Sequence, residues 1–167
     1  MMKQFQQMAL FILLLSVIGL TACSNDTKTE PDAKLARTKE AMQLAVYKSP
    51  DCGCCGLWMD HIESLGFITK THHPADLNKI KHTLGVQRQY QSCHTAVSTE
   101  GYVFEGHIPA PVMQRFLAEK PQGALGLAVP GMPLGSPGME MGNKRDDYDV
   151  LLLKKDGSST VYERIRH

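Results

Sequence analysis

The chain has 167 residues, and its 18 Lys and Arg against 17 Asp and Glu give a formal net charge of +1. This length suits one globular domain with a sizeable hydrophobic core. No run of like charges occurs, and because phosphate binding needs clustered Lys and Arg, we expect no nucleic-acid partner.

Residues 1–22 have the pattern of a bacterial export signal. Lys3 supplies a positive end, and an apolar run too short to span a bilayer follows. The run ends at Ala22-Cys23, which resembles a lipoprotein signal in which Cys23 is lipidated and becomes the mature N-terminus. An ordinary secretory signal with an incidental cysteine is the alternative. We expect a protein of the bacterial cell envelope that faces the periplasm and touches the membrane only through its lipid. Ser24 favours the outer membrane.

A polar tether, residues 23–40, separates this anchor from a domain at 41–167. In the first half of the domain, segments with the apolar pattern of a strand alternate with segments that have the apolar period of a helix, and turn residues separate them. They predict a strand at 42–47, a helix at 55–65, a strand at 67–71 and a helix between Pro74 and Gly85 whose apolar face is Leu77, Ile80 and Leu84.

The second half begins with a predicted hairpin at 95–98 and 102–105 and a helix at 111–120 that buries Val112, Phe116 and Leu117. The next stretch, 121–142, holds six Gly and four Pro. We expect no regular element there, but an apolar loop packed over another part of the domain. A final hairpin is predicted at 149–153 and 160–165.

This order of elements is that of a thioredoxin-like α/β domain, in which a strand and a CxxC-bearing helix lead into a parallel crossover. We therefore expect a mixed central sheet flanked by helices, with a long Gly/Pro/Met loop and a C-terminal β-hairpin.

The stretch SPDCGCCG holds three of the four cysteines that remain after Cys23, namely Cys52, Cys54 and Cys55. Cys52 and Cys55 have CxxC spacing, and the start of a helix stabilises a thiolate. An oxidising compartment suggests two disulfides, but the adjacency of Cys54 and Cys55 makes two bridges awkward. A redox couple and a metal site remain as interpretations.

The fourth cysteine, Cys93, lies with His94 in the segment before the predicted hairpin, which in this fold lies against the CxxC motif. Thiolates and thioethers together favour Cu(I). Met139 and Met141 would lie on one side of an extended chain, although methionines also fill irregular apolar gaps. For His107, ligation and a surface role are equally open, whereas His61, His72, His73 and His82 suit solvated positions.

Five segments in order, DCGCCG, SCHTA, EGHIPA, PGMPLGSPGMEMG and YDVLLL, resemble the CopG-like family of bacterial envelope proteins associated with copper resistance. The resemblance covers about residues 43–161. It implies a thioredoxin-like fold and copper binding through Cys52, Cys54, Cys55 and Cys93. The resemblance does not assign a role to His94 or to the methionines, which are candidate ligands only because of their side-chain chemistry.

Two functions fit these observations. The first is an envelope protein that sequesters Cu(I), with bridging thiolates that allow more than one ion, and with copper-export or copper-resistance proteins as partners. The second is a thioredoxin-type redox enzyme in which Cys52 and Cys55 are the catalytic couple and cycle Cu(I)/Cu(II) or thiol/disulfide. A structural zinc site explains the cysteines but leaves the methionine-bearing loop unexplained.

Overall fold

The structure, a computed structural model, describes residues 32, 34–36, 40 and 42–167. Cys23, the predicted signal peptide and most of the predicted tether lie outside the described residues. The elements of the domain are β1 (Gln43–Tyr47), α3 (Gly53–Ser64), β2 (Ile68–His72), α4 (Leu77–Thr83), η1 (Arg88–Tyr90), β3 (Thr95–Ser98), β4 (Val103–Glu105), α5 (Ala110–Glu119), β5 (Ala124–Ala128), β6 (Tyr148–Lys154) and β7 (Ser159–Ile165). In this described part of the chain, no helix is long and apolar enough to cross a membrane.

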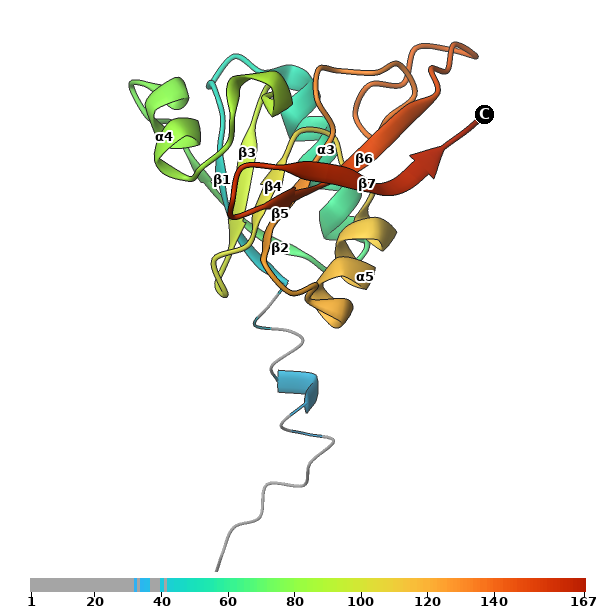
Figure 1. The fold of residues 1–167 in the computed structure, drawn as a ribbon. Coiled ribbons are helices and arrows are strands. Elements are labelled where there is room, and N and C mark those ends of the chain that lie inside the picture. The colour runs from blue at the N-terminus through green and yellow to red at the C-terminus, as the bar shows by residue number, and fades with distance from the viewer. Residues whose placement is uncertain (1–31, 33, 37–39, 41) are drawn as a thin grey trace, which may run out of the picture. The chain divides into compact units, whose positions relative to one another are not determined.

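One mixed sheet of seven strands organises the domain, in the order β2-β1-β3-β4-β5-β6-β7. β1 pairs with β2 in parallel across the crossover through α3, and β3 and β4 form the antiparallel hairpin. This is the expected thioredoxin-like arrangement, extended at one edge by the C-terminal hairpin of β6 and β7 (Figure 1).

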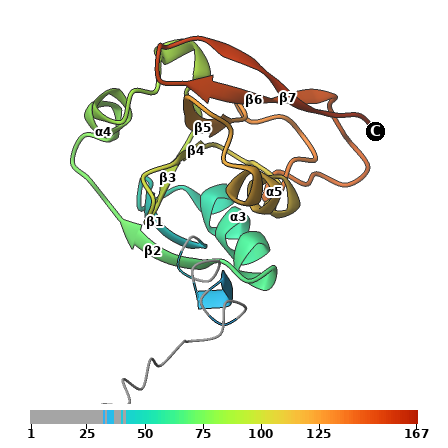
Figure 2. The ribbon, with the colours of Figure 1, turned by 60° about the horizontal axis from the view of Figure 1, so that its bottom comes forward.

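The core lies between the sheet and the pair of helices α3 and α5, which cover the same face (Figure 2). Trp58 of α3 and Phe116 of α5 are fully buried in it, and the Phe116 ring meets Phe104 of β4 edge to face. The expected burial of Val112 and Leu117 is confirmed. Because α3 is anchored by this packing, the cysteines at its N-terminus have a fixed position.

The expectation of no regular element in residues 121–142 was wrong for the segment that forms β5. This strand pairs in parallel with β4 and antiparallel with β6. Gly126, one of the glycines that suggested a loop, is the residue that lets β5 approach β4: a Cβ there would lie 1.7 Å from the Val103 carbonyl oxygen. A glycine inside a strand marks such a close approach of backbones.

The helix α4 also differs from its predicted pattern. The expected apolar face of Leu77, Ile80 and Leu84 is only half-buried, and the buried side chain is Lys81, with 2% of its surface exposed. A lysine is buried only when its charge is paired, and Lys81 pairs with Glu105 of β4. The period of apolar residues therefore identified the helix but not its inner face.

Candidate metal centre

Three cysteines occupy the N-terminus of α3. Cys52 is the N-cap residue, and because the helix begins at Gly53, Cys54 and Cys55 both lie in its first turn. Cys52 and Cys55 form a disulfide with a Cα–Cα distance of 5.5 Å. Cys54 keeps a free thiol, and its Sγ lies 3.5 Å from the Sγ of Cys52.

Cys93 joins this cluster from the segment that precedes β3. The Sγ atoms of Cys52, Cys54, Cys55 and Cys93 all lie within 4.8 Å of one another. Cys55 is fully buried and the other three are half-buried, so the cluster sits at the protein surface with its inner side in the core. The predicted approach of Cys93 to the CxxC motif is confirmed.

A second group of possible ligands shares Cys93. Its Sγ lies 3.2 Å from His94 Nδ1 and 2.9 Å from His107 Nε2. His107 Nδ1 is 2.7 Å from the carbonyl oxygen of Pro137. A carbonyl only accepts, so Nδ1 carries the proton and Nε2 presents its lone pair towards Cys93, which is how proteins orient a metal-binding histidine.

His94 is held by rings. It packs on Trp58, with ring centroids 4.2 Å apart, and meets His107 edge to face at 5.0 Å. Its Nε2 has no hydrogen-bond partner among the described residues, although the side chain is fully buried. A buried polar atom without a partner is costly, which makes the imidazole a candidate ligand rather than a packing group alone.

Burial sets the protonation of this centre. It lowers the pKa of His94 and of His107, so both imidazoles are neutral, the form that binds metals. Burial and, next, the Cys54 thiol raise the pKa of Cys93 to about 12. Without a metal, Cys93 is therefore a protonated thiol, and a bound metal must displace its proton.

The Gly/Pro loop packs over the start of α3, as expected. Gly138 has a φ of +82°, and a Cβ there would lie 2.6 Å from the Cys54 carbonyl oxygen and 2.7 Å from the backbone nitrogen of Trp58. Next to it, Met139 is half-buried, whereas Met141 is 59% exposed and forms a bridge with Lys144. The role of either thioether as a ligand remains a prediction.

The structure thus brings together Cys52, Cys54, Cys55, Cys93 and His94, and adds His107, which the sequence left open. Of the histidines expected in solvent, His73 and His82 are exposed and His72 is half-buried. His61 differs, because its Nε2 accepts a hydrogen bond from the backbone of Ala110 at 3.3 Å and burial lowers its pKa. Its contact to α5 has no local signal in the sequence.

Comparisons with known proteins agree with this description. The family described as "Protein of unknown function, DUF411" matches residues 90–139, which include Cys93, His94, His107 and Met139. No curated protein matches the chain.

Two solved structures of the copper resistance protein CopG, form 1 and form 2, match over nearly their full lengths. Form 1 is 39% identical, with 77% of this chain and 100% of that chain covered and a TM-score of 0.71. Form 2 is also 39% identical, with 74% and 98% covered and a TM-score of 0.70. The chain belongs to the CopG family.

Proposed function

We propose that this protein binds Cu(I) in the bacterial envelope through the thiolates of Cys52, Cys54, Cys55 and Cys93, and thereby limits copper toxicity. The observation that carries the proposal is the mutual approach of four Sγ atoms within 4.8 Å. Thiolates are soft ligands that select Cu(I), and the related structures are of a copper resistance protein.

The ligand set supports more than one Cu(I). A thiolate bridges two metal ions readily, and Cys93 belongs both to the four-sulfur group and to the group with His94 and His107. The thioethers of Met139 and Met141, on the loop that covers α3, offer further soft ligands. This mixed set of ligands is less suited to a structural zinc ion, which is held by four protein ligands in a closed site.

Full loading requires that the disulfide opens. A disulfide sulfur is a poor ligand compared with a thiolate, so Cys52 and Cys55 must gain two electrons and two protons to become thiols. A dithiol reductant of the envelope would supply these electrons and become a disulfide itself. Cu(I) then displaces the protons of the thiols that it binds.

The same disulfide favours a second candidate function, a redox enzyme with Cys52 and Cys55 as its couple. Two Cu(I) ions bound beside the disulfide would each give up one electron, and the products would be two Cu(II) ions and two thiolates. Cys54 and Cys93 would hold copper near the couple during this step. A partner that reoxidises the dithiol would complete the cycle.

The proposed location rests on the lipoprotein-like sequence that ends at Cys23. Cleavage after residue 22 and lipidation of Cys23 would tether the domain to the outer membrane, facing the periplasm. Envelope proteins of copper export or copper resistance are the proposed partners for its copper.

Copper content and X-ray absorption of the reduced protein, loaded with Cu(I) without oxygen, test the first function. We expect at least one equivalent of Cu(I) with scattering dominated by sulfur, and a short copper–copper distance if a cluster forms. Absence of stable copper in the reduced protein contradicts a binding function.

Cys54→Ser separates the two functions. If the thiols act as one metal site, this variant loses much of its Cu(I) stoichiometry or affinity, because Cys54 contributes one of four clustered sulfurs. If Cys52 and Cys55 act as a couple, the variant keeps the wild-type rate of dithiol oxidation and reduction. Loss of dithiol reactivity with unchanged copper binding contradicts both assignments of Cys54.

A further inference from the structure

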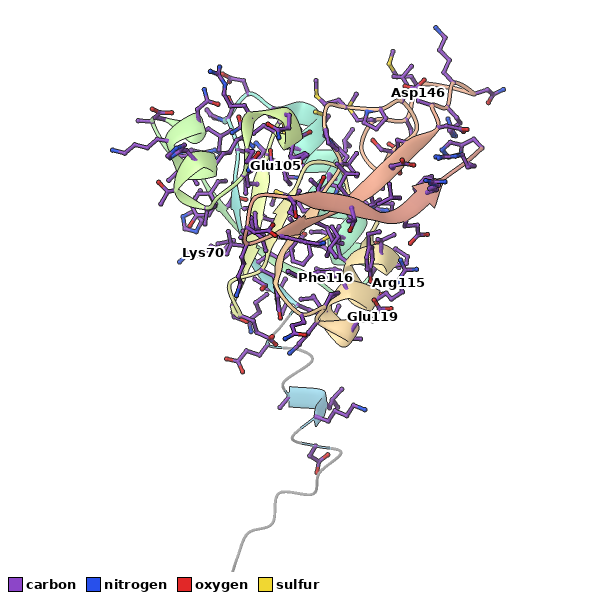
Figure 3. All side chains as sticks on the ribbon, in the orientation of Figure 1. Lys70, Glu105, Arg115, Phe116, Glu119 and Asp146 are labelled. Atoms are coloured by element: carbon purple, nitrogen blue, oxygen red, sulfur yellow. A yellow bond between two sulfur atoms is a disulfide. The ribbon has the colours of Figure 1, made fainter. Side chains whose placement is uncertain are left out.

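A buried network of charged and polar groups links α4 to the strands β3 and β4. Its centre is Glu105, the last residue of β4, whose carboxylate is fully buried and is labelled in the interior of the domain in Figure 3. One carboxylate oxygen accepts hydrogen bonds from Lys81 Nζ and from the backbone N–H of Ser92, the latter at 2.7 Å. The other accepts from the Thr95 hydroxyl at 2.5 Å, and Lys81 also donates to Thr95 Oγ1 at 2.9 Å.

Two hydrogen-bond partners of this carboxylate flank two of the candidate ligands along the chain. Ser92 immediately precedes Cys93 and His94, and Thr95 immediately follows them, so Glu105 holds both ends of this dipeptide. Among the described residues, no other side chain forms hydrogen bonds to both of these flanking residues.

The third candidate ligand, His107, lies two residues after Glu105, the residue at which β4 ends. Between them, the N–H of Gly106 donates to the carbonyl oxygen of His94 at 3.0 Å. Gly106 has a φ of +78°, and a Cβ there would lie 2.7 Å from Ser92 Oγ and 2.5 Å from the Val129 carbonyl oxygen. The two ligand-bearing segments are therefore in close backbone contact, and only glycine permits it.

Stability alone does not account for this network. Removal of a lysine and a glutamate from water costs more than their attraction returns unless the geometry is very good, and apolar replacements of such pairs are often neutral or stabilising. Among the described residues, none of the network's hydrogen bonds goes to the side chain of a candidate ligand, but they fix the backbone from which three of the ligands extend.

We infer that Glu105, neutralised by Lys81, is a positioning residue that fixes Cys93, His94 and His107 relative to the cysteines of α3. The inference rests on the proposed copper binding, and it names the residue that orders that same site. Cys93 is the one sulfur of the cluster that does not come from the start of α3, so its distance to the other three depends on the segment that Glu105 holds.

Two double variants test this role without leaving an unpaired buried charge. Lys81→Met with Glu105→Gln removes the ion pair but keeps a side-chain oxygen that accepts from the Ser92 N–H. Lys81→Met with Glu105→Leu removes the ion pair and the acceptor together. Both are expected to fold, and circular dichroism and thermal unfolding of each full-length protein check this before copper is added.

We expect the Gln double variant to keep a Cu(I) affinity close to that of wild type. The Leu double variant should bind Cu(I) about 10- to 100-fold more weakly, the loss that is typical when residues supporting metal ligands are removed. X-ray absorption should show fewer sulfur or nitrogen neighbours for its copper. Equal, wild-type affinity and coordination in both folded variants overturn the inference.

A readout without copper keeps this test separate from the proposed function. In the reduced apo protein, the Leu double variant should alkylate Cys93 faster than the Gln variant and shift the imidazole nitrogen resonances of His94 and His107. If wild type takes up no Cu(I), the proposed function fails, while this apo difference still decides the role of Glu105. Identical alkylation and resonances in the two variants contradict it.

Thr95→Val provides a test if a double variant does not fold. It removes one donor to the Glu105 carboxylate at nearly constant volume and leaves both charges in place. We expect faster alkylation of Cys93 and weaker Cu(I) binding than in wild type, and wild-type values for both overturn the inference.

Discussion

Because Cys93 is protonated without metal, we predict that the Cu(I) affinity of the protein rises with pH. The raised pKa of Cys93, about 12, means that the thiol is protonated across the whole range from about pH 6 to about pH 8. Each Cu(I) that binds through this sulfur releases one proton, so its contribution to the apparent affinity rises tenfold with each pH unit. Over these two units, Cys93 alone should raise the affinity about 100-fold.

The assay is a competition titration of the reduced protein with a coloured Cu(I) chelator, at several pH values without oxygen. Wild type and Cys93→Ser are compared, because the difference between their slopes of log affinity against pH counts the proton of Cys93. We expect the variant to have a slope lower by about one.

His82→Ala is the matched control, since His82 is exposed and outside the site, and it should keep the wild-type slope. Equal slopes for wild type and Cys93→Ser would refute the reasoning, because Cys93 would then be either a thiolate without metal or no ligand.

Three further predictions concern the surroundings of the cluster. Gly138→Ala should lower the free energy of unfolding by about 1–3 kcal/mol, because its φ is +82° and its Cβ would meet α3; Gly131→Ala, with a positive φ but open space around the Cβ, is the control and should cost less in denaturant unfolding. Trp58, the single tryptophan, packs on His94, so its fluorescence should change with copper until the site is full, and constant emission in copper-loaded protein would exclude His94 as a ligand. Met139→Ala with Met141→Ala should weaken Cu(I) binding, and unchanged affinity in the chelator competition would assign both side chains to packing.

Much of the site could be predicted from the sequence because its parts are local or follow from topology. The CxxC spacing places Cys52 and Cys55 at one helix start, and the order of elements brings the segment of Cys93 and His94 to the same edge. His107 was harder, because its inward orientation depends on a hydrogen bond to Pro137, thirty residues further along the chain.

The elements that were mispredicted depend on long-range partners. Gly126 looks like a loop residue until the close approach of Val103 shows why a strand needs it. Lys81 looks like a solvated helix residue until Glu105, from a different element, supplies its counter-charge. Local periodicity carries no information about either partner, so the roles of Gly126 and Lys81 follow only from the three-dimensional structure.

The sharing of Cys93 between two ligand groups connects the two candidate functions. In this structure the disulfide is closed and Cys52 and Cys55 are unavailable as thiolates, yet the ligand atoms of Cys93, His94 and His107 still lie within 4.8 Å of one another. Hydrogen bonds from Ser92 to Glu105 and between His107 and Pro137 help to hold them there. The oxidised protein therefore retains a mixed sulfur and nitrogen set, which suits Cu(II) better than four thiolates do. A protein that only stores Cu(I) has no need of ligands that remain in place after the Cys52–Cys55 disulfide forms. A protein that passes electrons between copper and the disulfide needs a site for the oxidised copper ion. Retention of Cu(II) by the disulfide form, and its loss in His107→Ala, would favour the redox function; release of all copper on oxidation would favour storage.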